Sequence, residues 1–203
     1  NASCTTHCLA PLAKVLHEQF GLERGFLTTV HPVTNEQHLL DRPGADPRMA
    51  RSALSSIIPV PTGAAKALGM VIPELEGRLE GLSVRVPPAV VSLLDLTFAS
   101  RRPLSAEAVN SALRFASRGG LKGILEVCDQ PLVSADFKGN RASCVVDAPS
   151  TRVSGDRLGK VLSWYDNEYA YASRCVELLR VFAAHREAVG EREAAAAPRS
   201  ARG

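Results

Sequence analysis

The sequence predicts an α+β fold in which a mixed, largely antiparallel sheet carries its helices on one face. Short runs rich in apolar and β-branched residues recur along the chain, and several of them follow one another with no helix between them. The chain has 203 residues, of which 45% are hydrophobic and 22% are charged. This is the composition of an ordinary globular protein, and the length is sufficient for a substantial hydrophobic core.

The first predicted element is an amphipathic helix over residues 5–20. Apolar residues recur along it at steps of three and four positions: Leu9, Leu12, Val15, Leu16 and Phe20. The polar segment 1–3 precedes this pattern, as expected before a helix start. Cys4 therefore lies at the N-terminus of a helix.

A strand is predicted next, over residues 25–30, because this run has strand composition and ends where Pro32 cannot donate a ladder hydrogen bond. His31 then lies at the end of the strand. The following residues, 34–56, are polar and rich in proline and glycine, so we expect a long loop there.

The remaining elements follow from the same patterns. Helices are expected over residues 63–70, 105–115 and 168–189, and strands over 83–87, 90–98, 124–127, 132–135, 144–146 and 160–164. We expect residues 1–167 to form one domain. The last segment, 190–203, is rich in Ala, Arg and Glu without aromatic residues, and is predicted to be a disordered tail.

Charge and cysteine content exclude several classes of protein. A formal charge of +3 is too small to predict nucleic-acid binding, and no apolar run approaches the roughly 20 residues of a membrane helix. Five cysteines in a chain of this length do not form a secreted disulfide scaffold, so we expect a cytoplasmic protein. Cys4 and Cys8 lack a second downstream ligand pair, so no metal site is expected.

Cys4 and His31 are the candidate catalytic pair. A thiol acts as a nucleophile only when ionised, and a helix N-terminus lowers the pKa of a cysteine there. A histidine at the end of the next strand could reach Cys4 and serve as its base. The sequence leaves open that Cys4 is simply a buried cysteine and His31 an ordinary core or surface residue.

Eight short segments give the chain a resemblance to a known family. They are Ala2–Pro11 (ASCTTHCLAP), Thr28–His31, Thr34–Asn35, Ile57–Pro59, Thr62–Ala67, Arg85–Pro87, Leu132–Ser134, and the run Ser163–Glu168 (SWYDNE). In this order they resemble the catalytic half of phosphorylating glyceraldehyde-3-phosphate dehydrogenases. The resemblance covers about residues 1–188, and it implies that the NAD-binding half of such an enzyme is absent.

The resemblance also implies a role for each candidate site residue. Cys4 would attack the aldehyde, with His31 as its base. The other implied contacts are Thr34 and Arg85 for the phosphate of the sugar, Ser3, Thr5, Thr62 and Gly63 for inorganic phosphate, and Asn167 for the nicotinamide of NAD. From the residues alone, Thr62 and Asn167 could equally be helix caps, and Arg85 could be an exposed strand residue.

The implied reaction is the NAD-dependent oxidation of glyceraldehyde 3-phosphate to 1,3-bisphosphoglycerate in a homotetramer, with helix 168–189 packed on the missing domain. We expect the 203-residue chain alone to be inactive, because it contains no Gly-x-Gly-x-x-Gly turn for NAD. An erythrose-4-phosphate dehydrogenase and a non-catalytic fragment remain alternatives. Two departures from the family pattern bear on activity: His7 replaces an asparagine, and Met49 stands where many bacterial members have arginine.

Overall fold

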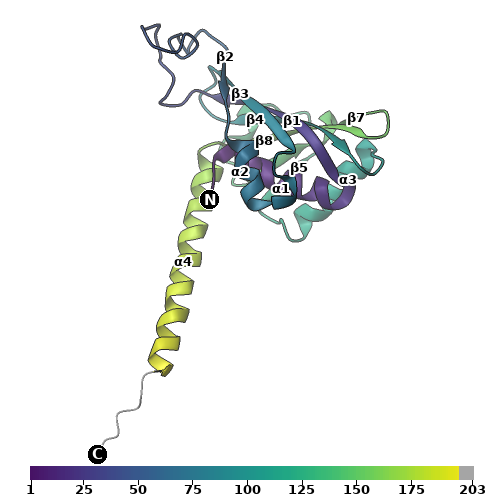
Figure 1. Ribbon diagram of the computed structural model, residues 1–203, viewed down its shortest axis with the longest axis vertical. Coiled ribbons are helices and arrows are strands. Elements are labelled where there is room, and N and C mark those ends of the chain that lie inside the picture. Colours follow the sequence, from purple (N-terminus) through teal and green to yellow (C-terminus); the bar gives the residue numbers. More distant parts are fainter. Residues whose placement is uncertain (197–203) are drawn as a thin grey trace, which may run out of the picture.

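The computed structural model describes the backbone of residues 1–196 and the side chains of residues 1–186. An eight-stranded sheet lies at its centre (Figure 1). The strands are β1 (Leu22–Pro32), β2 (Ile58–Pro61), β3 (Leu79–Val86), β4 (Ser92–Ser100), β5 (Leu125–Cys128), β6 (Cys144–Asp147), β7 (Arg152–Ser154) and β8 (Leu158–Tyr165).

The sheet is mixed and mostly antiparallel. Its order is β2-β3-β1-β4-β8-β6-β5, and β7 pairs with β8 off this path. Only the β1–β3 and β5–β6 pairs are parallel, and the other five pairs are antiparallel. The predicted α+β class is therefore confirmed.

Three helices pack on one face of this sheet, as predicted: α1 (Cys4–Phe20), α2 (Ala64–Val71) and α3 (Ala106–Arg118) (Figure 1). A fourth helix, α4 (Tyr169–Ala196), leaves the sheet and projects away from it. Short 3₁₀ helices are η1 (Pro73–Leu75), η2 (Ser134–Phe137) and η3 (Ala148–Ser150).

The core lies between the sheet and the three helices. In β4, alternate residues are buried on the helix side, including Leu94, Leu96 and Phe98. They meet the buried face of α1, where Leu12 and Leu16 are fully inaccessible. Burial of each such side chain contributes about 1.5–3 kcal/mol, which fixes α1 on the sheet.

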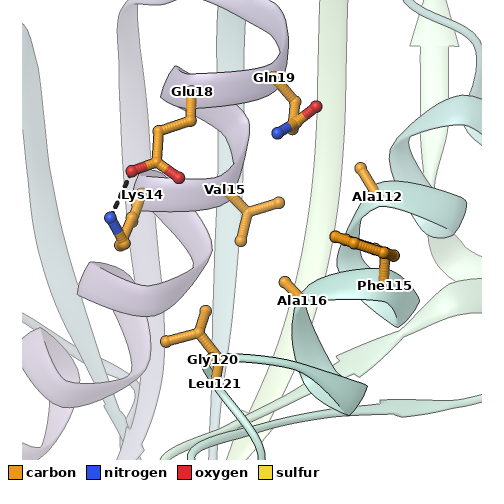
Figure 2. A pocket seen from close by; sticks show the side chains of 9 residues that line it. All are labelled: Lys14, Val15, Glu18, Gln19, Ala112, Phe115, Ala116, Gly120 and Leu121. Carbon is orange, nitrogen blue, oxygen red and sulfur yellow. Dashed lines mark hydrogen bonds and ion pairs between the residues drawn. The ribbon is translucent and has the colours of Figure 1, made fainter.

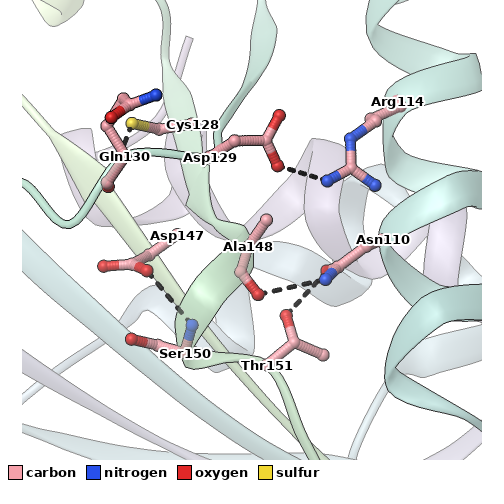
Figure 3. Close-up of polar contacts among 9 residues, drawn as sticks. All are labelled: Asn110, Arg114, Cys128, Asp129, Gln130, Asp147, Ala148, Ser150 and Thr151. Carbon is pink, nitrogen blue, oxygen red and sulfur yellow. Dashed lines mark hydrogen bonds and ion pairs between the residues drawn. The ribbon is translucent and has the colours of Figure 1, made fainter.

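Polar contacts hold α3 to the edge of the sheet beside η3 (Figure 3). The side-chain amide of Asn110 donates to the carbonyl of Ala148 at 3.0 Å, and its oxygen accepts from the hydroxyl of Thr151 at 2.7 Å. Arg114 forms an ion pair with Asp129, which follows β5. These contacts join the helical layer to the strand edge without involving any predicted site residue.

The other face of the sheet is uncovered by the described part of the chain. Phe26 of β1 is 72% exposed and Leu82 of β3 is 42% exposed on this face. Such a large apolar exposure on a sheet is typical of a surface that meets another protein.

The structure corrects several predicted elements. Residues 132–135 do not form a strand, because the Asp136 carboxylate accepts the N–H of Val133 and the chain turns into η2. β2 and β7 were not predicted, since β2 alternates proline with apolar residues. α4 continues to Ala196, past the predicted end at residue 189, and the rest of the predicted tail, 197–203, lies outside the described residues.

Candidate active site

Cys4 is the first residue of α1. The preceding residue, Ser3, is the N-cap of the helix, and its hydroxyl oxygen accepts the N–H of Thr6 at 3.1 Å. This is the cap that a serine before an apolar periodic run provides. The predicted placement of Cys4 at a helix N-terminus is confirmed.

His31 lies beside Cys4 because α1 and β1 follow each other in the chain, run in opposite directions and have similar lengths. Gly21, with φ of 67°, makes the turn between them, a conformation that favours glycine. Sixteen helical steps span ~24 Å, and the nine strand steps from Leu22 to His31 span ~30 Å. The Nε2 atom of His31 consequently lies 3.4 Å from the Sγ atom of Cys4.

A buried tyrosine lies beneath this pair. The hydroxyl of Tyr165, at the end of β8, lies 2.8 Å from the hydroxyl of Thr5 and 2.7 Å from that of Thr29. The ring of Tyr165 also meets the ring of His31 edge-on at 6.2 Å. We did not predict this residue, although inward alternation along β8 would have placed it on the helix side of the sheet.

Cys4 and His31 open into a cavity of about 700 Å³, a volume in the range of small-molecule sites. Its lining also contains Thr34 and Asn167, two other predicted site residues. Val33, Asn35, Gln37, Leu39 and Glu168 complete the lining. The structure therefore brings four of the nine predicted residues to one cavity.

The electrostatics of Cys4 correct one expectation. Burial raises the pKa of the Cys4 thiol, and this effect outweighs the lowering by hydrogen bonds from Thr5 and by the positive charge of Arg85. Burial also lowers the pKa of His31, against a hydrogen bond to Pro32 that raises it. Both shifts favour a neutral thiol beside a neutral imidazole.

Arg85, on β3, contacts His31 of the candidate catalytic pair. In the parallel β1–β3 ladder His31 is directly paired with Arg85, so both side chains lie on the helix side of the sheet. The Nη1 atom of Arg85 lies 2.6 Å from the Nδ1 atom of His31 and donates to the carbonyl of Pro32 at 3.2 Å. Arg85 is half-buried, so it is not the exposed strand residue that the sequence also allowed.

Thr34 lies just after β1, at the mouth of the cavity, and is exposed. The side-chain oxygen of Gln37 accepts from the N–H and the hydroxyl of Thr34, at 2.8 and 3.0 Å. The amide of buried Gln37 donates to the sulfur of Met49 at 3.8 Å. Gln37 is a supporting residue that we did not predict, because nothing in a polar loop marks one glutamine as buried.

Thr62 and Gly63 lie between β2 and α2, outside the lining of this cavity. The hydroxyl oxygen of Thr62 accepts the N–H of Ala64 at 3.3 Å, and Gly63 is the N-cap of α2. Thr62 therefore lies one position before the N-cap of α2 and is not the cap itself. Ser3 and Thr5 lie next to Cys4 because they are its two neighbours in the sequence.

Asn167 lines the same cavity as Cys4. Its side-chain oxygen accepts the N–H of Val91 at 3.0 Å and faces the hydroxyl of Ser92 at 3.4 Å. It stabilises Val91, whose φ of 72° is unfavourable for a β-branched residue. The N-cap role belongs to Asp166, which accepts the N–H groups of Glu168 and Tyr169.

Another hollow lies between α1 and α3 and contains no predicted site residue (Figure 2). It is lined by Val15, Phe115 and Leu121, with the Lys14–Glu18 ion pair at its rim. In the described part of the chain, we find no group of three side chains able to hold a metal ion. No described helix combines the length and the apolar character required to cross a bilayer.

Comparisons with known proteins agree with this geometry. Over 178 residues, 88% of this chain, it is 54% identical to the glyceraldehyde-3-phosphate dehydrogenase of Geobacillus stearothermophilus, and the match covers 53% of that protein. Over 184 residues, 90% of the chain, it is 50% identical to the chloroplastic glyceraldehyde-3-phosphate dehydrogenase B of Pisum sativum, covering 41% of that protein. The chain thus spans about half the length of the curated relatives it matches.

A family model gives the same result. The model described as glyceraldehyde 3-phosphate dehydrogenase, C-terminal domain, matches residues 3–167, which include every predicted site residue. The chain is also 54% identical to the glyceraldehyde-3-phosphate dehydrogenase of Borreliella burgdorferi over 180 residues, which are 88% of this chain and 54% of that protein. On these grounds the chain belongs to the glyceraldehyde 3-phosphate dehydrogenase family and corresponds to its C-terminal domain.

Proposed function

We propose that this chain supplies the catalytic domain for the phosphorylating oxidation of glyceraldehyde 3-phosphate to 1,3-bisphosphoglycerate. The observation that carries the proposal is the distance of 3.4 Å between Cys4 Sγ and His31 Nε2, in a cavity shared with Thr34 and Asn167. A thiol and an imidazole at this separation can exchange a proton while the sulfur faces a bound carbonyl.

His31 takes the proton of Cys4, and the sulfur adds to the aldehyde carbon to form a thiohemiacetal. His31 then assists removal of the hydroxyl proton as the carbon is oxidised to a thioester. Inorganic phosphate attacks the thioester and releases the acyl phosphate with regeneration of Cys4. The thioester conserves the free energy of oxidation until phosphate attacks, which an ordinary ester of serine would not.

Two phosphate positions are required beside Cys4. Arg85 and Thr34 are proposed for the phosphate of the sugar, because a guanidinium and a hydroxyl donate to phosphate oxygens without blocking the sulfur. Ser3, Thr5, Thr62 and Gly63 are proposed for inorganic phosphate, the first two from the N-terminus of α1. Met49 offers no charge where an arginine would strengthen anion binding, so we expect weak affinity for phosphate.

NAD is the proposed oxidant, and it would accept the hydride of the thiohemiacetal when bound. Asn167 fits the nicotinamide end of this cofactor, since it lines the cavity of Cys4 and only its oxygen is engaged by Val91 and Ser92. Its amide N–H groups remain able to donate to a carboxamide oxygen. The chain has no glycine-rich dinucleotide turn, so we expect no NAD reduction by these 203 residues alone.

Assembly and location are proposed on separate grounds. The uncovered sheet face with exposed Phe26 and Leu82 supports subunit association, and we propose a homotetramer for the protein that carries a cofactor domain. We propose a packing role against that domain for α4, whose Val176, Leu179 and Phe182 are exposed. A catalytic thiol must stay reduced, which supports a cytoplasmic location.

Protection of Cys4 from alkylation tests the function without NAD. The chain is incubated with glyceraldehyde 3-phosphate, erythrose 4-phosphate or unphosphorylated glyceraldehyde, then treated with iodoacetamide, and Cys4 labelling is measured by peptide mass spectrometry. We expect the triose phosphate to protect Cys4 at the lowest concentration. Equal protection by unphosphorylated glyceraldehyde would refute the phosphate site, and stronger protection by the tetrose would favour an erythrose-4-phosphate dehydrogenase. If no aldehyde protects Cys4, the result would favour the interpretation that the chain is a non-catalytic fragment.

A further inference from the structure

Three of the five cysteines lie close together on the sheet side of α1. Cys4 is the first residue of the helix and opens into the active-site cavity. Cys8 follows one turn later and is fully buried. Cys144, the first residue of β6, is also fully buried. The proposed reaction uses the thiol of Cys4 alone, so it assigns no role to the other two.

Cys8 and Cys144 meet where α1 packs on the sheet. Cys144 and Val146 point into the core under the helices, because they alternate with Val145 along β6. Cys8 belongs to the same core, and α1 contacts β6 directly. The two thiols hydrogen-bond to each other. Their sulfur atoms are therefore already neighbours in the folded chain.

Cys8 also has Cys4 as a neighbour. Burial raises the pKa of the Cys8 thiol well above its usual value, and the nearby thiols of Cys144 and Cys4 raise it further. Cys4 and Cys8 are four positions apart in α1, so their Cβ atoms lie about 5–6 Å apart on one side of the helix. Cys8 is thus placed to react with either of the other two thiols.

Cys4 is the member of this group that a small oxidant can reach. It is half-buried at a cavity of about 700 Å³, whereas Cys8 and Cys144 have no exposed surface. A peroxide oxidises the thiolate form of a cysteine, and the Nε2 atom of His31 lies 3.4 Å from the sulfur to take its proton. The first product is a sulfenic acid, which further peroxide converts irreversibly to a sulfinic acid. A neighbouring thiol that reacts with the sulfenic acid first prevents this loss.

A disulfide between Cys4 and Cys8 would be strained. Such a bond requires Cβ atoms about 3.5–4.5 Å apart, which is less than the separation of two residues one helical turn apart. Cys4 is able to approach because it is the first residue of α1, where the backbone N–H has no partner within the helix. Strain makes a disulfide easier to reduce, so a third thiol in contact with it can exchange into it. Cys144 is in contact with Cys8 and is that third thiol.

We propose that Cys8 and Cys144 form a disulfide that removes the oxidation of Cys4 by a peroxide and regenerates the Cys4 thiol. The peroxide transfers one oxygen atom to the Cys4 sulfur and is reduced to water or an alcohol. The sulfur of Cys8 then bonds to that of Cys4, and the displaced hydroxyl leaves as water with the Cys8 proton. Finally the sulfur of Cys144 attacks Cys8, and its proton passes to the departing sulfur of Cys4. In total, one peroxide is reduced and two thiols are oxidised to one disulfide.

This protection goes beyond the proposed function. It uses neither the aldehyde nor the phosphate contacts, and it requires only that a peroxide reaches Cys4. The disulfide joins α1 to β6 inside the core, where the two sulfur atoms already lie together, so the active-site cavity keeps its free thiol. A strong reductant that enters when the fold opens would reset the pair.

Peptide mass spectrometry of the 203-residue chain after limited treatment with hydrogen peroxide tests the proposal. The folded chain is oxidised, the peroxide is removed, and the chain is unfolded at slightly acidic pH in excess N-ethylmaleimide, which blocks free thiols before they exchange. Trypsin then releases Cys4 and Cys8 in one peptide, 1–14, and Cys144 in another, 142–152. We expect a disulfide that links these two peptides, with the maleimide on Cys4.

The wild-type chain decides the question without any variant. If the two peptides stay unlinked, the proposal is overturned, whether Cys4 remains a thiol, forms a disulfide with Cys8 or becomes a sulfinic acid. A linked pair that carries the maleimide on Cys8 would overturn it as well, because Cys144 would then have reacted with Cys4.

Variants test the order of the steps. In Cys4→Ser the two peptides should stay unlinked, since the peroxide then has no thiol to enter by, and a linked pair would show that Cys4 is not the entry point. In Cys144→Ser the same peroxide dose should leave less Cys4 open to iodoacetamide than in the wild type. The control Cys128→Ser, at the half-buried end of β5, should retain the wild-type labelling of Cys4. Equal loss of free Cys4 in Cys144→Ser and the wild type would show that Cys144 does not regenerate it.

Discussion

The hydroxyl of Tyr165 lies 2.8 Å from the hydroxyl of Thr5, directly after the candidate nucleophile. With the 2.7 Å contact to Thr29, it completes a chain of three hydroxyl groups, Thr29, Tyr165 and Thr5, and Thr5 in turn bonds to Cys4. Burial raises the pKa of Tyr165 well above its usual range, so the phenol keeps its proton and remains a donor. The chain fixes the start of α1 to the sheet.

Tyr165→Phe should destabilise the fold. The substitution removes one hydroxyl and leaves those of buried Thr5 and Thr29 without their shared partner, at a cost of about 1–3 kcal/mol. Urea unfolding followed by circular dichroism measures this cost. Tyr169→Phe is the matched control, because Tyr169 is half exposed and should change stability by less than about 0.5 kcal/mol. Equal effects of the two variants would show that the buried hydroxyl chain contributes no stability.

Cys4 should react as a half-buried thiol that depends on its base. Because burial raises its pKa, we expect its alkylation rate to rise roughly tenfold per pH unit from pH 7 to pH 9 without a plateau. His31→Gln should lower the rate at pH 7 by roughly 10- to 100-fold, since glutamine cannot take the proton. Iodoacetamide kinetics with peptide mapping measures both, with half-buried Cys128 as the internal reference thiol. A plateau below pH 8 would instead indicate a resting thiolate.

Proximity of Cys4 to His31 could be predicted from the sequence because it depends on local features. A periodic helix, a single-residue turn at Gly21 and a strand of matching length bring the two residues together. The apolar period and the proline after His31 mark these boundaries in the sequence.

The contact of Arg85 with His31 could not be predicted in the same way. It depends on the parallel pairing of β1 with β3, and these strands are separated by the long loop, β2 and α2. No local pattern specifies which strand pairs with which over such a separation. Tyr165 could not be predicted for the same reason, because its hydrogen-bond partners Thr29 and Thr5 lie 136 and 160 positions away in the sequence.

Gly81→Ala should destabilise the sheet strongly. A Cβ atom on Gly81 would lie 2.4 Å from the backbone oxygen of Leu27 in the neighbouring strand β1, where neither atom can move without disturbing the parallel ladder. We expect a loss of about 1–3 kcal/mol in the free energy of unfolding. Gly120→Ala is the control, because its Cβ would meet nothing within 4 Å. Chemical unfolding of both variants checks the prediction, and a neutral Gly81→Ala would mean that β1 and β3 are less closely paired than the structure has them.

Stability should fall as the pH drops below neutrality, and His7 should contribute to the fall. Burial lowers the pKa of His7, and the positive charges of the amino terminus and Arg174 lower it further. The folded chain therefore favours the neutral ring. This ring stacks on Tyr171 with 5.3 Å between the ring centroids, and its Nε2 atom accepts the N–H of Ala2. An unfolded histidine has a pKa of about 6.5. Below that pH the unfolded chain binds more protons than the folded one, so the contribution is complete above about pH 6.5 and is lost as the pH falls toward the folded pKa.

The test is urea unfolding of the wild type and His7→Asn between pH 5 and pH 8. Asparagine does not titrate, so the variant should lose less stability than the wild type between pH 7 and pH 5. Part of the pH dependence should persist in the variant, because burial also lowers the pKa of His31. His185→Asn, on the exposed part of α4, is the matched control and should retain the wild-type slope. If His7→Asn retained that slope as well, the half-buried ring of His7 would not be the group that titrates on unfolding.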